Sequence, residues 1–213
     1  MADSKEDVAS QALARLGEPS ISSFTEDSDA AEKVNQLYEP TILQLLSSHD
    51  WSFATTRVAL SEDASGAPVN EWQRAFLMPT LGTSRVGKPM AVYNSATAGA
   101  SRVTSGYEIR GKWIDTNFTT VVIEYIERKN ESEWPGYFQT LAIEALAATL
   151  AMPITENASK EQMHRAIAYG APSANNRGGL FRTATEADAI GDATRSLIDD
   201  HDPIALARFG SAF

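Results

Sequence analysis

The chain has 213 residues, 43% of them hydrophobic and 22% charged, with a formal net charge of -10 and no cysteine. This composition predicts a globular protein with one sizeable core and extensions. The lack of cysteine excludes disulfides, thiolate zinc ligands and thiol redox chemistry. The negative charge argues against general nucleic-acid binding, which needs Lys and Arg against phosphates. We expect neither a signal peptide nor a membrane span, and therefore a chain that is cytosolic when made.

The first part of the chain predicts two helices. One covers residues 4–16, with a capping start at Ser4 and a stop at Gly17. The second begins near Ser28, and its apolar stripe continues in phase past Pro40. An interior proline bends a helix without ending it when the stripe persists, so we expect one kinked helix here.

The stretch HDWSFATTRVAL, residues 49–60, marks a change from helical to alternating periodicity. Trp51 and Phe53 are two residues apart, which places them on one face of an extended segment. We expect this pair to fasten the second helix against a sheet. Together with Arg57 and Trp72, it forms a predicted fold hinge, and the tryptophans are expected in the core.

Alternating segments predict four or five antiparallel strands between residues 56 and 128. The segments are EWQRAFLMP, PMAVYNS, YEIRGKWIDT and TVVIEYIER. Between two of them, residues 95–106 have few large side chains to bury. This stretch is typical of a long, mobile hairpin loop, a kind of segment that often makes contacts.

Helical spacing returns after Pro135, where an alanine-rich stretch predicts the central helix of a bundle. Ser159 and Gln162 predict a capping box for the next helix, and Thr183 and Glu186 predict one for the last. The apolar side chains of the helix after Ser159 are Met163, Ala166, Ile167 and Tyr169.

The tail HDPIALARFGSAF, residues 201–213, is too apolar for a solvated terminus and too short for a core of its own. We expect it to dock, and the residues leave open whether it docks on its own chain or on a partner.

Candidate chemistry is sparse. The three histidines are far apart and form no H-x-x-x-H pair, so we predict no metal site and no cofactor. The neighbours His49 and Asp50 are better explained by a structural junction than by acid–base catalysis. Glu124 and Glu127 would have to serve a glycosidase-like hydrolase, but on a strand they point to opposite faces. No catalytic residue is therefore predicted.

Several motifs follow one another in a fixed order. The first half contains an A-x-x-x-L-G helix end, a W-x-F-A-x-x-R-x-x-L segment and a W-x-x-x-F-x-x-P strand, and the second half contains Leu-Ala pairs that close on Pro-Ile-Thr. The positions are Ala12, Leu16, Gly17, Ile21, Ala30, Ala31, Tyr38, Trp51, Phe53, Ala54, Arg57, Leu60, Trp72, Phe76, Pro79, Leu141, Ala142, Leu146, Ala147, Leu150, Ala151, Pro153, Ile154 and Thr155. Over roughly residues 5–170, this order resembles the head-to-tail adaptor (connector) family of tailed bacteriophages, including the tail tubular protein A group.

The resemblance implies an α+β fold, in which an α-helical bundle carries an inserted small antiparallel β-sheet domain and an extended C-terminal tail. The implied boundaries are 1–55 and 134–200 for the bundle, 56–130 for the β domain and 201–213 for the docking tail. It further implies a ring, usually of twelve copies, beneath the portal protein. Such a ring links the head to the next tail or neck protein, and DNA passes through its lumen without specific binding.

The resemblance also implies a location in the virion neck, with no membrane partner and no catalysis. By analogy we expect residues 203–213 to engage the portal, chiefly through Ile204, Leu206, Arg208, Phe209 and Phe213. We expect the loop of residues 94–106 to face the tail through Ser101, Arg102 and Val103. Two alternatives are a tail-associated hydrolase acting on cell wall or capsule, and a chaperone or interaction module unrelated to virions.

Overall fold

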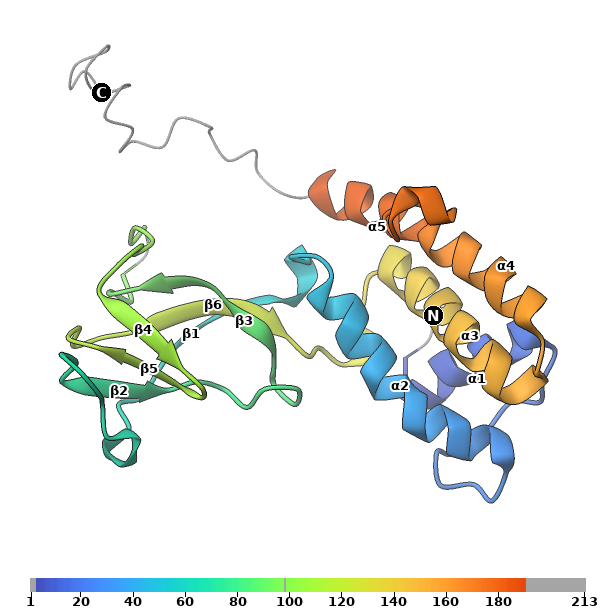
Figure 1. Cartoon of the computed structure of the whole chain (residues 1–213), viewed down its shortest axis with the longest axis horizontal. Helices are drawn as coiled ribbons and strands as arrows, with labels where there is room; N and C mark the ends of the chain where they lie inside the picture. The colour runs from blue at the N-terminus through green and yellow to red at the C-terminus, as the bar shows by residue number, and fades with distance from the viewer. Residues whose placement is uncertain (1–2, 98, 191–213) are drawn as a thin grey trace, which may run out of the picture.

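The computed structural model describes residues 3–97 and 99–190. These residues form five α-helices and two three-stranded antiparallel sheets, so the predicted mixed α+β class is confirmed. Figure 1 shows the helices gathered at one end of an elongated molecule and the sheets at the other. The predicted docking residues between Ile204 and Phe213 lie outside the described part.

The helical end is organised around α3. Helices α1 (Lys5–Leu16) and α2 (Asp29–Ser47) precede the strands, and α3 (Gly136–Thr155), α4 (Ala158–Tyr169) and α5 (Gly179–Ile190) follow them. Helix α3 contacts each of the other four, and most of its side chains are buried. Its many alanines let the neighbouring helices approach closely, as the sequence predicts.

The starts of α1 and α2 agree with their sequence signals. The Ser4 side chain accepts a hydrogen bond from the backbone N–H of Asp7 at 3.1 Å, and Gly17 ends α1 in the left-handed conformation. The Ser28 side chain caps α2 by accepting from the N–H of Ala31. Helix α2 is continuous past Pro40, as predicted.

The starts of α4 and α5 differ from the prediction. The cap of α4 is Asn157, not Ser159, because the Asn157 side chain accepts from two backbone N–H groups of the first turn. Helix α5 begins at Gly179, four residues before the predicted Thr183. Gly179 lies against the end of α4, where an added Cβ would be 2.3 Å from the carbonyl oxygen of Ile167. This close contact leaves no room for a Cβ, so the position needs glycine.

The burial of α4 is also opposite to its apolar pattern. Met163 and Ile167, two of the four apolar residues noted for this helix, are 51% and 42% exposed, whereas His164 and Ala168 are buried. The reason is a long-range contact: Nδ1 of His164 lies 2.8 Å from the carboxylate of Glu144 on α3. This polar pair turns the apolar side chains outward.

The first sheet has the order β1-β6-β3, with β1 (Thr55–Ala59), β6 (Val122–Glu127) and β3 (Arg85–Tyr93). Strand β3 contains an irregularity between Val86 and Ala91, where the register with β6 shifts. The ends of this sheet nearest the helices reach the helical core, because Val86 and Ile126 belong to the same apolar cluster as the buried helix residues.

The second sheet has the order β2-β5-β4, with β2 (Arg74–Leu77), β5 (Trp113–Thr116) and β4 (Tyr107–Arg110). The described chain therefore has six strands instead of four or five, because YEIRGKWIDT forms two strands around a tight turn at Gly111, whose φ is 60°. Side chains from both sheets share one apolar cluster that includes Phe76, Ile114 and Ile123.

Residues 95–106, predicted as a hairpin loop, connect β3 to β4, which lie in different sheets. The connection folds back once, since the N–H of Val103 donates to the carbonyl oxygen of Val92 at 2.8 Å. It then crosses to the second sheet. The segment is therefore a crossover that begins like a hairpin.

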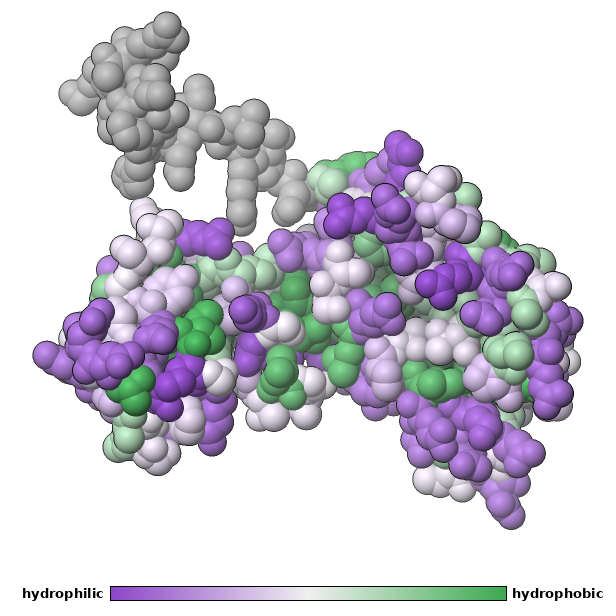
Figure 2. Space-filling view, viewed as in Figure 1, coloured by the Kyte–Doolittle hydropathy of each residue, from purple (hydrophilic) through white to green (hydrophobic). Residues whose placement is uncertain are grey.

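Within the described residues, α3 is also the one helix whose length and composition would allow it to cross a membrane. The sequence prediction expected no such stretch. Because 67% of its apolar window is buried inside the protein, we interpret α3 as the core helix. Figure 2 shows one face of the molecule, on which hydrophilic residues predominate and apolar patches lie among them.

Candidate functional site

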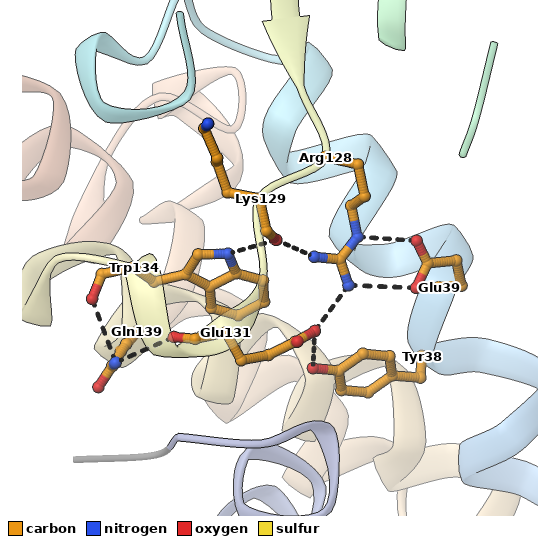
Figure 3. Close-up of polar contacts among 7 residues, drawn as sticks. All are labelled: Tyr38, Glu39, Arg128, Lys129, Glu131, Trp134 and Gln139. Atoms are coloured by element: carbon orange, nitrogen blue, oxygen red, sulfur yellow. Dashed lines mark hydrogen bonds and ion pairs between the residues drawn. The ribbon is translucent and has the colours of Figure 1, made fainter. Parts of the chain in front are cut away.

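The main polar cluster lies where the sheets meet the helices, at the end of β6 (Figure 3). Nε of Arg128 lies 2.8 Å from one carboxylate oxygen of Glu39 on α2, and Nη2 lies 3.2 Å from the other. The same Nη2 lies 2.6 Å from Glu131, which also accepts a hydrogen bond from the Tyr38 hydroxyl at 3.0 Å. The Arg128–Glu131 pair is shielded from water, because both side chains are less than 10% exposed, whereas Glu39 is 39% exposed.

The segment between β6 and α3 is held by a second set of bonds. Nε1 of Trp134 donates to the carbonyl oxygen of Lys129 at 3.1 Å, and Nη1 of Arg128 donates to the same oxygen. The amide of Gln139 on α3 donates to the carbonyl oxygen of Trp134 at 3.1 Å. The connection is therefore held by bonds within itself and by one from Gln139 in the first turn of α3.

Arg128 and Tyr38 keep their protonation states at this junction. Burial lowers the pKa of Arg128, but the hydrogen bonds that it donates to Glu39 and Glu131 outweigh burial and raise the pKa above its ordinary value. Burial, then the charge of Glu131, raises the pKa of Tyr38, so that its hydroxyl stays protonated and continues to donate. A permanently charged guanidinium and a permanently neutral phenol suit a structural joint better than proton transfer.

Trp51, the first predicted hinge residue, is fully buried beside this junction. Its Nε1 donates to the carbonyl oxygen of Leu45 at 3.0 Å, near the end of α2. Its ring contacts Phe138 of α3 and Phe181 of α5, with centroids 5.0 Å and 6.0 Å apart. Trp51 therefore ties α2 to α3 and α5, where we had expected it to tie α2 to a sheet.

The expectation of an extended segment at this position was wrong. Residues Ser52–Ala54 form a 3₁₀ turn, so the spacing of two does not place Trp51 and Phe53 on one face of a strand. The two rings are nevertheless close, with centroids 6.1 Å apart, and Phe53 also contacts Phe138. The turn lets both rings reach the helical core before β1 begins.

The buried carboxylate of Asp188 anchors α5 to the same region. It accepts from the backbone N–H of Ser52 at 2.9 Å, from the Ser52 hydroxyl at 2.7 Å and from the Tyr137 hydroxyl at 2.6 Å. Nε2 of His49 lies 3.7 Å from it. Burial, then the hydrogen bond to Asp188, raises the pKa of Tyr137.

The other predicted hinge residues lie on the sheets. Nη2 of Arg57 on β1 lies 2.7 Å from Glu124 and donates to the Tyr93 hydroxyl at 2.8 Å, and the first of these bonds raises the pKa of Arg57. Trp72 is half-buried before β2, and its Nε1 donates to Glu108 at 3.1 Å. The structure thus brings Trp51 and Phe53 together, while Arg57 and Trp72 make separate contacts.

The predicted tail-facing residues lie on the crossover. Ser101 is exposed, the Arg102 guanidinium donates to the carbonyl oxygen of Met90, and Val103 pairs with Val92. Two of the three are therefore tied to β3. In residues 3–97 and 99–190, no group of three or more His, Cys, Asp or Glu side chains has metal-site geometry.

Arg128, Glu39 and Glu131 were missed at the sequence level. Eighty-nine positions separate Arg128 from Glu39, so no local pattern joins them. The usable signal was the run ERKNESEW, in which several charges lie between a buried strand and a core helix.

The fold and this junction define a mixed α+β protein whose helices and sheets are joined by buried ion pairs. No protein-family model matches the chain, and no curated protein matches it. The adaptor resemblance therefore stays a prediction from the residues themselves.

Proposed function

We propose that the chain is a structural head-to-tail adaptor of a tailed bacteriophage. Copies form a ring that docks under the portal protein, links the head to the tail and leaves a conduit for DNA. In this proposal the helices are a bundle, the strands are a β domain inserted in it, and the protein acts in the virion neck without catalysis.

The observation that best supports the proposal is the junction. The W-x-F-A segment, on which the resemblance depends, lies where α2 passes into β1, and Trp51 is fully buried there. The return connection from β6 to α3 carries the ion pairs of Arg128. Breaking a buried charged network is costly, so the two ends of the molecule are held firmly together. A link between two large assemblies needs such a joint.

The proposal assigns two segments of the chain to different partners. Residues 203–213, including Arg208, engage the portal, and the crossover near Ser101, Arg102 and Val103 faces the next tail or neck protein. Adjacent copies meet through unlike surfaces, which close into a ring by rotation.

The hydrolase alternative finds less support. Glu124 is buried and bonded to Arg57 and Tyr93, while Glu127 bonds Thr56 and Lys129. Their carboxylates are engaged in separate structural contacts, so they do not form an acid–base pair facing a common cleft.

Mixing the purified chain with the portal protein of the same virion tests the proposal. Negative-stain microscopy should show rings capping the portal, and deletion of residues 203–213 should abolish capping. As a matched control, Ser101→Tyr, at an exposed position of the crossover, should leave capping unchanged and weaken binding of the next neck protein. Monomers that never bind the portal would contradict the adaptor function, and capping by the shortened chain would contradict the role of the tail.

A further inference from the structure

A charged cleft of about 750 Å³ lies on the face of the first sheet that is turned away from the second sheet. Its charged lining consists of Asp50, Arg57, Lys88, Arg102 and Glu124. In β-sheet register, Arg57 is directly opposite Glu124, which in turn is opposite Ala91. The floor of the cleft is therefore a row across three strands, and the crossover after β3 forms one wall.

Two of the cations that line this cleft, Lys88 and Arg102, are not part of the ion pair between Arg57 and Glu124. Arg57 is already paired with Glu124 at 2.7 Å. Lys88 lies in the irregular part of β3 and Arg102 on the crossover, and both are exposed. Among the described residues, no carboxylate forms an ion pair with either of them. The cleft thus carries two exposed cations beside the Arg57–Glu124 pair, with Asp50 as its one further carboxylate among the described lining residues.

The chain leaves α5 next to this cleft. Asp188 is bonded to Ser52, and Asp50, two residues before Ser52, is part of the cleft lining. The described chain ends at Ile190, two residues after Asp188, and Ile190 is 85% exposed. The end of α5 is thus linked to the cleft lining through the contact between Asp188 and Ser52.

The sequence that continues from Ile190 carries charge of the opposite sign. Asp199, Asp200 and Asp202 lie within four positions, directly before the apolar tail. Asp199 is nine positions after Ile190, and an extended chain of that length reaches up to about 30 Å. Reach and charge complementarity both favour a local contact.

We propose that this cleft binds the chain's own acidic segment, Asp199–Asp202, through Lys88 and Arg102. The contact places the start of the apolar tail on the sheet side of the molecule and leaves residues 203–213 beyond it. The inference does not depend on the adaptor function, because it concerns a contact within one chain.

Cysteine cross-linking of the full chain tests this contact, since the native sequence contains no cysteine. Ser101→Cys places a thiol beside Arg102, and His201→Cys places one within the acidic segment without removing an aspartate. The matched control pairs His201→Cys with Gln162→Cys on the exposed side of α4. With a short bismaleimide at low protein concentration, we expect cross-linking at position 101 to be about tenfold faster than at position 162, because docking raises the effective concentration.

A second set of measurements tests the role of the charges on Lys88 and Arg102. Adding Lys88→Glu and Arg102→Glu should reduce the rate at position 101 to that of the control, and 1 M salt should do the same because it shortens the Debye length to about 3 Å. Equal rates at positions 101 and 162, or a rate that neither salt nor charge reversal changes, would overturn the proposal. Cross-links between a chain carrying only Ser101→Cys and one carrying only His201→Cys would show that a second copy supplies the segment, and would overturn the assignment to the same chain.

Discussion

At the scale of single residues, His164 shows how one polar contact sets the orientation of a helix. Its imidazole is buried between α3 and α4, with Nδ1 at 2.8 Å from Glu144, whose other oxygen is bonded to Arg15 of α1. In the described part of the chain, its buried Nε2 has no hydrogen-bond partner. Burial first, then the positive charges of Arg15 and Lys160, lowers the pKa of His164 below its ordinary value of 6.5.

This lowered pKa predicts a pH-dependent stability. The unfolded chain takes up the His164 proton near pH 6.5, whereas the folded chain takes it up only at a lower pH. The contribution of the neutral imidazole is therefore fully present above pH 6.5 and is lost as the pH falls through the lowered pKa of the folded state. Urea unfolding at several pH values between 7.5 and 5 should show this decline in the free energy of unfolding.

Substitution of His164 tests whether this side chain causes the pH dependence of stability. In His164→Gln the decline below pH 6.5 should be smaller than in the wild type, because the titrating imidazole is gone. His49→Gln is the matched control, since His49 lies at a more exposed site 3.7 Å from Asp188. Identical pH profiles for the wild type and His164→Gln would refute the assignment.

At the scale of elements, α5 depends on one carboxylate for its position. The Asp188 carboxylate accepts two hydrogen bonds from Ser52 and one from Tyr137. Asp188→Ala removes their acceptor, and because Ser52 is exposed and Tyr137 is half-buried, the loss is about 0.5 to 1.5 kcal/mol for each hydrogen bond. We expect hydrogen exchange of the α5 amides to accelerate while the amides of α3 keep their protection.

The matched control for this prediction is Glu186→Ala, on the same helix but on its exposed side, where Glu186 pairs only with Arg182. It should leave exchange in α5 unchanged. Equal acceleration in both variants would mean that α5 responds to its own helix propensity and not to the Asp188 anchor.

The elements also show which features were predictable. Ser4 and Ser28 cap their helices through contacts three residues away, so a local pattern was sufficient. The orientation of α4 was not predictable, because it depends on Glu144, twenty positions from His164. The hairpin at Gly111 was overlooked because its two short strands read as one alternating run. Of the candidate site, the burial of Trp51 was predicted, whereas its partners on α3 and α5 follow from tertiary packing.

At the scale of the whole molecule, the question is whether the helices and sheets unfold as one unit. Val86 and Ile126 extend the helical core into the first sheet, and Arg128 joins that sheet to Glu39 of α2. Two covalent connections, before β1 and after β6, run through the same junction. These contacts favour a single cooperative transition, in which amides of β6 and α3 exchange with the same free energy as urea rises.

Arg128→Met should break this cooperativity. It leaves the carboxylate of Glu131, which is 4% exposed, without its cation, and removing one partner of a buried pair costs about 3 to 5 kcal/mol. Native-state hydrogen exchange should then give β6 a lower opening free energy than α3, whereas Arg182→Met, which breaks an exposed pair on α5, should leave the two equal. If β6 and α3 already exchange with different free energies in the wild type, the sheets are an independent folding unit, and the ion pairs at the junction orient the two ends without coupling their stability.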